Sequence, residues 1–530
     1  MTKTAVTRRT VLRTALATTA LAAPFVRRIE AAPLIVPNGK MTLAWHTNIA
    51  ARWLDPQQHD GTASPDNFIM ALHDGLIKNF REEKYDHLAL AEKYDFAEDA
   101  KGATFRLRQG LKFHDGTPVT PADVKWSFEH YRGAWGEVLK SKTDGVELVD
   151  DRTVRFSFKE PFLDFPILFG TGNVCGAGWV VPAKYYEKVG QDGFMQKPIG
   201  AGPYKLVSQQ QGIKLEFEAF DDYYRPVHIK NFTMLSVPEA ATRVAMLERG
   251  EVDLMYFVPG ELIERVKNNP KIILAPVVSA PWWLEFPGFQ DPKSPFHDKR
   301  VRQAVSLAID REAINQAECA GFGKVMGNWI TDDVEYGLAW PKWEYNVAKA
   351  KKLMAEAGFP NGFAVDWVTP VPDYYSRGER IVSQLQAIGI RAKLQVMERG
   401  VFLKKMQTGI KAWPGVQIIF NAARIGGTWS NWYDTMFKCE GFQAKGFFCV
   451  TELDDKFKKY LSSFDRTERK TLAENIQRAI LEEFYFVPVF RHAFVNAFGP
   501  RLAAAKWQDV FPTITSGYAY PWEDITLKAG

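Results

Sequence analysis

The sequence predicts an α/β protein with partly mixed sheets, built from at least two domains. Three observations carry this prediction. Segments with strand and helix patterns are interspersed along the whole chain, without repeats or low-complexity linkers. The chain has 530 residues, which are too many for a single hydrophobic core. Its composition, 46% hydrophobic and 24% charged residues, is that of an ordinary folded protein.

The first element is an export signal, residues 1–32, which does not belong to the fold. It contains TRRTVLR, which fits a twin-arginine export motif, and a weakly apolar run over residues 14–24 follows. That run is too short to span a membrane. Cleavage near residues 20–22 and near residues 31–33 are both open, and a frayed basic tail is the alternative to a signal. No cysteine precedes Cys175, so we expect a soluble periplasmic product without a lipid anchor or membrane insertion.

The positive charge of the chain belongs to this signal. The whole chain carries 67 basic and 62 acidic residues, a net charge of +5. Residues 1–32 contain six basic residues against Glu30 alone, so the remainder is balanced at 61 of each sign. A neutral body argues against nucleic acid as a partner and against electrostatic binding to membranes.

A strand, a turn and a helix follow one another within residues 104–132. The strand is predicted by alternating apolar and basic residues, and the turn by His-Asp-Gly at residues 114–116. Thr120 is placed as the N-cap of the helix, with Pro121 at its first position and Asp123 at its third.

Further elements are predicted by their own caps and periodicities. Residues 236–250 read as a helix with Pro near its start and Gly at its end, and residues 252–257 read as a short buried strand. Asp298 and Asn346 are predicted N-caps of two amphipathic helices. The second of these helices stops at Gly358.

The four cysteines predict one disulfide. Cys439 and Cys449 are close in sequence and lie in a loop rich in Gly and Phe, so we expect them to pair in an oxidising compartment. Cys175 and Cys319 read as buried free thiols. Zinc is not expected, because no cysteine pair has C-x-x-C spacing and the nine histidines are scattered.

Five segments share one resemblance. They are the strand, HDG turn and TPADV helix of residues 104–132, PIGAGPYK at 198–205, PEAATRVAMLERGEVD at 238–253, FHDKRVRQAVSLAIDR at 296–311 and AKKLMAEAGFPNGF at 350–363. In this order they resemble the signature segments of the peptide/nickel-type (family 5) solute-binding proteins of bacterial ABC importers, including the dipeptide- and oligopeptide-binding proteins. The glycines, prolines and helices in them shape the fold without forming a site.

The resemblance implies a two-lobed periplasmic-binding-protein fold of class II with an additional satellite domain. Its mixed sheets would hold a ligand cleft between the lobes, and the lobes would close by hinge rotation. By analogy, lobe I combines residues 33–75, 199–283 and 490–530, the satellite domain covers 76–198, and lobe II covers 284–489. The implied partners are a peptide-like or small-molecule ligand and an ABC permease in the inner membrane. The implied state is a monomer without a cofactor.

The sequence contains none of the common catalytic motifs. G-x-S-x-G, H-E-x-x-H, the P-loop and G-x-G-x-x-G are all absent. We therefore expect a binding protein and no enzyme, with a periplasmic hydrolase on the same fold as the less favoured alternative.

The ligand loop departs from the peptide-binding relatives. They hold the ligand's amino terminus with an acidic residue before a short disulfide, whereas residues 420–432 carry no acidic residue here and Asp434 is the first. Arg424 lies at or beside the expected carboxylate and would repel an ammonium group. Arg399 stands where dipeptide-binding relatives place an aromatic residue. Arg377 is the nearest candidate for the arginine that clamps a peptide carboxylate in relatives.

Arginines and tryptophans are therefore the predicted ligand contacts. Arg424 and Arg399 are candidates for a bidentate carboxylate or phosphate site, against the alternative of surface or ion-paired arginines. The tryptophans are candidates for stacking, against the alternative that they belong to the core; they are Trp429, Trp432, Trp282, Trp283, Trp45 and Trp53. His46 and His59 as ligands of a metal chelate are a minor alternative.

The predicted ligand is a peptide-like or small anionic organic solute, such as an opine, a phosphorylated sugar or a modified peptide. An oligosaccharide held by tryptophan stacking is the alternative within the same class of receptor. If the anion clamp is real, Arg424→Ala should weaken binding at least about tenfold without unfolding the protein.

Overall fold

The structure is a computed structural model. It describes residues 36–59, 63–78, 88–171, 176–330, 334–369, 375–397, 399–422, 429–441, 447–504 and 521–528. Within these residues, no helix has the length and apolarity that crossing a membrane requires.

The central element is a mixed sheet of ten strands, in the order β12-β11-β13-β10-β14-β9-β1-β8-β7-β6. Its strands are β1 (Asn38–Trp45), β6 (Tyr204–Gln210), β7 (Lys214–Ala219), β8 (Ile229–Ser236), β9 (Leu254–Met255), β10 (Ile273–Glu285), β11 (Phe363–Thr369), β12 (Ile390–Val396), β13 (Val416–Ala422) and β14 (Phe486–Phe498). β1 runs parallel to β8 and β9, and β11 runs parallel to β12 and β13. The other pairs are antiparallel, so the prediction of a mixed α/β fold is confirmed.

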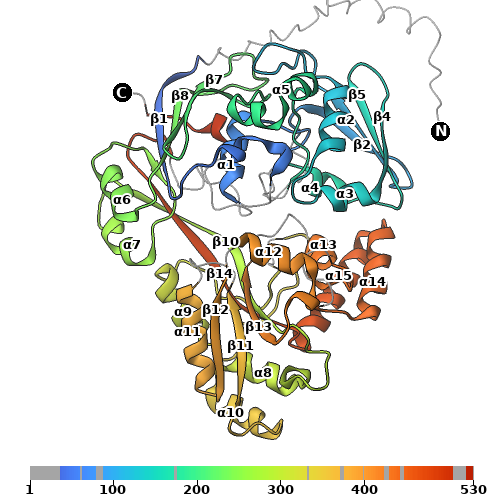
Figure 1. Ribbon diagram of the computed structural model, residues 1–530, viewed down its shortest axis with the longest axis vertical. Helices are drawn as coiled ribbons and strands as arrows, with labels where there is room; N and C mark the ends of the chain where they lie inside the picture. The colour runs from blue at the N-terminus through green and yellow to red at the C-terminus, as the bar shows by residue number, and fades with distance from the viewer. Residues whose placement is uncertain are drawn as a thin grey trace, which may run out of the picture. The chain divides into compact units, whose positions relative to one another are not determined.

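Two long strands, β10 and β14, join the two halves of this sheet. They pair with each other from Ile273 opposite Phe498 to Glu285 opposite Phe486, and lie side by side in Figure 1. The last residues of β14 also pair with β9, whereas the last residues of β10 pair with β13. The strand ladder therefore runs without interruption from the β1 side to the β13 side.

Two hydrophobic cores flank these long strands. The first core holds residues such as Met41, Phe105, Phe232 and Trp522. The second core holds residues such as Val301, Ile381, Ile418, Ile476 and Phe486. β14 contributes to both, because Phe498 belongs to the first core and most of the strand to the second.

A second, antiparallel sheet has four strands in the order β2-β3-β5-β4. They are β2 (Ala91–Phe96), β3 (Gly102–Leu107), β4 (Thr143–Leu148) and β5 (Thr153–Phe158). Phe105 and Phe156 pack edge-to-face across neighbouring strands of this sheet, with ring centroids 5.8 Å apart. The sheet lies inside the predicted satellite domain, residues 76–198; the bounds of that domain and of the lobes stay predictions.

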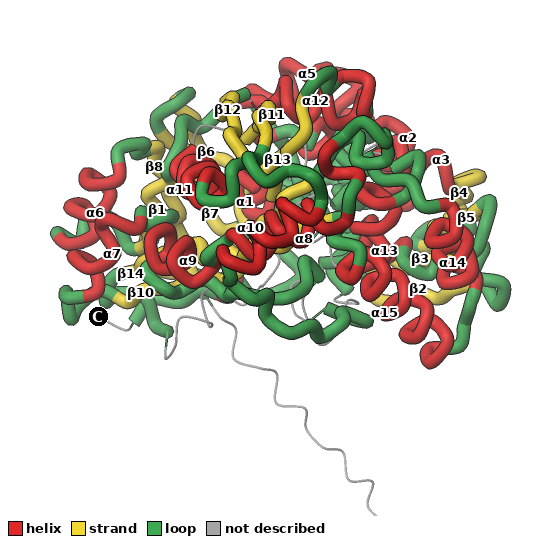
Figure 2. Tube along the Cα trace, turned by 90° about the horizontal axis from the view of Figure 1, so that it is seen from below, coloured by secondary structure: helices red, strands yellow, loops and turns green. Residues whose placement is uncertain are grey.

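The helices cover both sheets. They are α1 (Ala63–Leu72), α2 (Pro121–His130), α3 (Gly136–Lys142), α4 (Phe165–Phe169), α5 (Ala183–Gln196), α6 (Ala240–Glu248), α7 (Gly260–Lys267), α8 (Lys299–Ala308), α9 (Arg311–Cys319), α10 (Val347–Glu356), α11 (Tyr375–Gln386), α12 (Arg399–Thr408), α13 (Trp429–Trp432), α14 (Thr451–Ser462) and α15 (Arg466–Glu482). Figure 2 shows α8 and α10 packed side by side. Short turns of 3₁₀ or π helix lie at Ala51–Leu54, Pro56–Gln58, Pro295–His297, Ile410–Ala412, Tyr433–Phe437 and Trp522–Asp524.

The helix starts predicted after Thr120, Asp298 and Asn346 are confirmed. The carboxylate of Asp123 accepts hydrogen bonds from the backbone N–H and the hydroxyl of Thr120, at 3.0 and 2.7 Å, as the capping pattern requires. Asp298 accepts from the Arg300 N–H at 2.8 Å, and Asn346 accepts from the Lys349 N–H at 2.9 Å.

Two predicted boundaries were wrong. The helix expected over residues 236–250 begins at Ala240 and is capped by Glu239, because Ser236 is still part of β8 and pairs with Trp45 of β1. The strand expected over residues 252–257 shrinks to the two residues of β9, since β1 and β14 pair with it only there.

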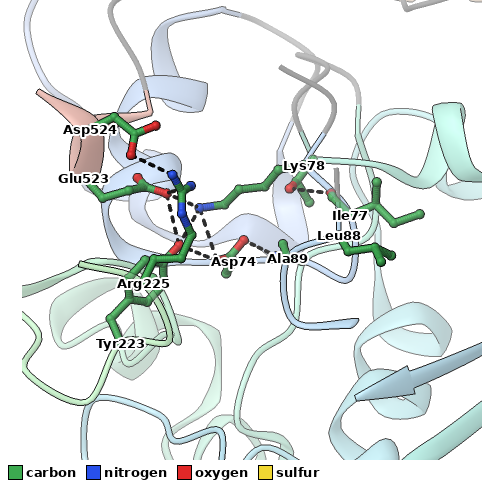
Figure 3. Close-up of polar contacts among 12 residues, drawn as sticks. Asp74, Ile77, Lys78, Leu88, Ala89, Tyr223, Arg225, Glu523 and Asp524 are labelled. Carbon is green, nitrogen blue, oxygen red and sulfur yellow. Dashed lines mark hydrogen bonds and ion pairs between the residues drawn. The ribbon is translucent and has the colours of Figure 1, made fainter. Parts of the chain in front are cut away.

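A buried ion cluster ties the end of the chain to the segment after α1 (Figure 3). Lys78 Nζ lies 3.1 Å from both Asp74 Oδ2 and Glu523 Oε1, and donates to the Tyr223 hydroxyl at 2.8 Å. That hydroxyl donates to Asp74 at 2.8 Å, and Arg225 Nη1 lies 3.1 Å from Glu523. The cluster thus joins three segments that are up to 445 residues apart.

The predicted disulfide is confirmed. Cys439 and Cys449 are bonded, with their Cα atoms 4.2 Å apart, and the prediction of a buried free thiol also holds for Cys319. Cys175 lies outside the described residues.

Candidate ligand-binding site

The ends of β1 and β9 bring two aromatic residues together. Ala44 and Met255 are register partners in these parallel strands, so the next residues, Trp45 and Tyr256, are neighbours. Their rings stack with centroids 4.7 Å apart and an interplanar angle of 17°. Aromatic side chains therefore mark the carboxyl ends of parallel strands, where open α/β sheets bind ligands.

The long strands continue this line of rings toward β13. His492 and Phe494 lie two residues apart on β14, hence on one face, with ring centroids 5.0 Å apart. Phe494 approaches Tyr256 at 6.1 Å, and His492 approaches Trp282 of β10 at 6.2 Å. We call the whole line the aromatic row; its members are Trp45, His46, Tyr256, Phe257, Phe494, His492, Trp282 and Phe420.

The aromatic row is only partly covered. His46, Phe257 and Phe494 are half-buried, whereas the other members are buried. Phe257 has a positive φ of 60°, and its N–H donates to the Asn496 side chain at 3.0 Å. This backbone conformation is uncommon for a bulky residue and turns the chain at the end of β9. Strained positions of this kind concentrate at functional sites.

A buried guanidinium lies against the row. Arg377 of α11 places its guanidinium 4.8 Å from the Trp282 ring centroid and its Nη2 2.7 Å from His492 Nε2. Its Nε is 3.0 Å from Glu318 Oε2, and Glu318 also pairs with Arg380 at 2.8 Å. Two cations thus share one carboxylate.

A buried carboxylate lies on β10, three residues after Trp282. Glu285 of β10 accepts a hydrogen bond from the Asn421 side chain of β13 at 3.0 Å. Burial raises the pKa of Glu285 to about 7, although that hydrogen bond acts in the opposite direction. β13 ends at Ala422, two residues before Arg424, so this carboxylate is hydrogen-bonded to the strand that leads into the predicted ligand loop.

The predicted tryptophans fall into two environments. Trp45 and Trp282 belong to the aromatic row. Trp283 and Trp432 pack on each other in the second core, with centroids 5.0 Å apart. The remaining two also pack on core rings, Trp429 against Tyr460 and the half-buried Trp53 against Phe68. Contact between any of these side chains and a ligand stays a prediction.

The predicted arginines cannot be placed. Arg424 lies outside the described residues, and Arg399 is described only in its backbone, at the first position of α12. Their role in binding stays a prediction. Of the minor candidates, the His46 ring lies tilted against Tyr256 with centroids 4.6 Å apart, and His59 lies 3.6 Å from Asp66. Within the described ranges no three His, Cys, Asp or Glu residues group as metal ligands do.

Sequence reasoning missed several members of the row. Tyr256 and Phe257 end the predicted strand 252–257, and His492 and Phe494 alternate within the apolar run VPVFRHAFVNAF. A strand with aromatic residues at its carboxyl end was an available signal. The signal missing from the sequence was which strands would become neighbours.

One further contact joins the two cores. Asp164, just before α4, accepts a hydrogen bond from the Ser430 hydroxyl of α13 and lies 3.2 Å from Arg469 Nη2 of α15. Arg469 also donates to the Tyr460 hydroxyl at 2.7 Å. We call this group the Asp164 bridge. It is almost fully buried, and its Ser430 lies within residues 420–432 of the predicted ligand loop.

Comparison with known proteins gives three findings. The sequence profile of the bacterial extracellular solute-binding proteins of family 5, middle region, matches residues 87–415. The glutathione-binding protein GsiB of Escherichia coli strain K12 is 26% identical over 472 residues, covering 85% of this chain and 88% of that protein. Periplasmic binding protein AgaA of A. tumefaciens R10, solved with agropinic acid, is 25% identical with a TM-score of 0.76, covering 93% and 99% of the two chains.

A solved structure of lower identity shares the fold. DppA of Helicobacter pylori, solved with the peptide STSA, is 22% identical with a TM-score of 0.77. The match covers 93% of this chain and 98% of that one. The architecture of both cores and of the connecting strands is therefore common to proteins of very different sequence.

Proposed function

The chain belongs to the bacterial extracellular solute-binding proteins of family 5, and from this premise we propose that it captures a small, carboxylate-bearing solute of peptide-like or opine-like chemistry. Its fold is the two-lobed fold of periplasmic binding proteins, and its role is that of the solute-binding component of an ABC importer. The family consists of binding proteins, so the chain retains its solute without chemical turnover.

The observation that carries the ligand class is the positive group beside the aromatic row. Arg377 and Arg380 both pair with Glu318, so two guanidinium groups lie around one carboxylate beside the row. In surroundings of low dielectric constant, these guanidinium groups attract an anion and repel an ammonium group. The half-buried rings of Phe257 and Phe494 would cover the apolar part of such a solute.

The relatives point to the same chemistry. Glutathione and agropinic acid, the molecules named for GsiB and AgaA, both carry carboxylates. Arg424 and Arg399 would add positive charge to the site from the ligand loop and from the start of α12. A peptide held through a free amino terminus fits less well, because residues 420–432 lack an acidic residue.

An oligosaccharide is the second candidate. The specific observation in its favour is the continuous line of rings, since aromatic faces stack on sugars as well as on apolar groups. The charge beside the row favours the carboxylate-bearing solute over a neutral sugar.

Delivery and export complete the proposal. The loaded protein would dock as a monomer on an ABC permease of the inner membrane. It would reach the periplasm by the twin-arginine signal of residues 1–32.

Native mass spectrometry of protein purified from its own producing cells tests the proposal. One small anionic molecule per chain, released on unfolding, is the expected result. Arg424→Ala should lose that molecule or bind it at least about tenfold more weakly. Arg155→Ala, an exposed change on β5, is the control and should retain it.

Other outcomes would contradict the proposal in different ways. A heterogeneous set of short peptides would show that the missing carboxylate does not exclude amino termini. A neutral sugar would favour the second candidate. An empty protein that binds neither glutathione nor agropinic acid would overturn the carboxylate proposal.

A further inference from the structure

We propose that His492 positions the bound solute by donating a hydrogen bond from its Nδ1–H to a solute oxygen. The inference rests on the proposed function and adds the chemistry of one contact. At this point of the site the solute presents an acceptor, a carboxylate or carbonyl oxygen, and not a donor.

The tautomer of His492 follows from its partner. Arg377 Nη2 lies 2.7 Å from His492 Nε2. A guanidinium has donors and no acceptor, so Nε2 must accept and the ring proton must lie on Nδ1. A second ring proton is disfavoured, because burial and the charge of Arg377 hold the pKa of His492 well below its ordinary value. The ring is therefore neutral, with its N–H fixed at Nδ1.

That N–H has no acceptor within the described part of the chain. His492 is 2% exposed, and its Nδ1 is buried without a hydrogen-bond partner. Rings surround it, with centroids at 5.0 Å for Phe494, 6.2 Å for Trp282 and 6.4 Å for Phe257. A buried donor left unpaired is destabilising, and proteins pair nearly all such groups. An oxygen of the bound solute would supply the missing acceptor.

The position of His492 in the sheet supports this role. Its strand neighbours on β14, Arg491 and Ala493, pair with Pro281 and Val278 of β10, and the register of the two strands shifts between these partners. Irregularities of this kind re-aim side chains and are common beside functional sites. The same ring contacts both half-buried members of the row on its flank, Phe257 and Phe494.

The resulting contact discriminates between solutes that present an acceptor oxygen and solutes that present an ammonium group. A solute oxygen would accept the hydrogen bond from His492 Nδ1, while Arg377 occupies Nε2 on the other side of the ring. An ammonium group would leave the Nδ1–H unpaired and would face the guanidinium. A site built around a fixed donor rejects analogues that lack the acceptor far more strongly than an apolar pocket does.

Two substitutions separate this role from a structural one. His492→Asn places an amide N–H near the position of Nδ1 and loses the acceptor for Arg377. His492→Gln reaches the position of Nε2, keeps an acceptor for Arg377 and loses the donor at Nδ1. Isothermal titration of solute-stripped protein with glutathione and with agropinic acid, together with thermal denaturation, compares the two variants with wild type.

The proposal predicts that the variant with the higher solute affinity is not the variant with the higher melting temperature. For whichever probe the wild type binds, His492→Asn should stay within about threefold of its affinity, and His492→Gln should lose at least about tenfold while melting close to wild type. Equal affinity of wild type and His492→Gln would overturn the inference and leave the proposed function standing. A wild-type protein that binds neither probe and retains no solute would overturn the proposed function, and the inference with it.

A measurement on the unmodified protein covers the case in which both variants fail to fold. In ¹⁵N-histidine spectra, His492 should show a protonated Nδ1 and an unprotonated Nε2. The Nδ1 resonance should move between stripped and loaded protein. A proton on Nε2, or an Nδ1 resonance unmoved by a bound probe, would overturn the inference.

Discussion

Glu285 shows how one buried side chain couples the stability of this protein to pH. It is 2% exposed, and its hydrogen bond from Asn421 holds it against β13. In the unfolded chain it titrates near 4.5, whereas burial raises its pKa to about 7 in the folded protein. Between these values the folded state keeps a proton that the unfolded chain has lost. The free energy of unfolding therefore falls as the pH rises through this window.

Glu285→Gln should remove this dependence. The glutamine keeps an acceptor for Asn421 and cannot ionise. We expect it to be more stable than wild type by up to about 3 kcal/mol near pH 8, because the wild-type carboxylate is costly to ionise while buried, and nearly equal near pH 4.

Urea denaturation at both pH values measures the difference. Glu147→Gln, an exposed change on β4, should leave the pH dependence as it is. A wild-type protein whose stability does not fall across the window would contradict the prediction.

Among the helices and strands, the features that depend on neighbouring residues in the sequence were predicted correctly. The N-caps Thr120, Asp298 and Asn346 were predicted correctly, because capping bonds join groups only two or three residues apart. The length of β9 was not predicted, because it depends on β1 and β14, more than 200 residues distant.

The candidate site was predicted only in part for the same reason. Trp45 and Trp282 were chosen from their place in the chain, and the structure places both in the aromatic row. Trp429 looked accessible beside two glycines, yet Tyr460 and Phe457 of α14 enclose its ring. His492 was overlooked, because its partner Arg377 comes from a helix 115 residues earlier. Contacts between residues so far apart in the sequence are set by the fold, and no local sequence pattern indicates them.

A second prediction concerns the stability that the ion cluster of Lys78 gives the protein by holding the short element Trp522–Asp524 in place. Lys78→Met should destabilise the protein by about 3–5 kcal/mol, because it leaves Asp74 and Glu523 buried together without their cation. Chemical denaturation measures the loss.

A matched control is available for that change. Lys112 pairs with Asp222 at 3.0 Å, but both side chains are about half exposed. Lys112→Met should cost no more than about 1 kcal/mol. Similar losses in the two variants would show that the buried cluster contributes little.

For the whole molecule, the Asp164 bridge links the two cores away from the long strands. If the two lobes rotate about β10 and β14, such a contact favours the conformation in which it forms. Its hydrogen bonds and ion pair should therefore contribute to solute affinity.

Asp164→Asn tests this link. The amide removes the charge that faces Arg469, and we expect about tenfold weaker binding of the co-purified solute, or of glutathione as the probe, through faster release. Stopped-flow release and small-angle scattering measure the rate and the compactness of the loaded protein. Asp151→Asn, an exposed change, is the control. Unaltered release by Asp164→Asn would show that the bridge is purely structural.

The place of β14 in the sheet also has a consequence for how the protein is made. This strand lies between β9 and β10, contributes to both cores, and is synthesised almost last. The partner of Lys78, Glu523, emerges from the ribosome later still. A nascent chain of some 480 residues would therefore expose the edges of both strands and an unpaired lysine, with neither core complete. Neither core can therefore be completed before β14 has been synthesised.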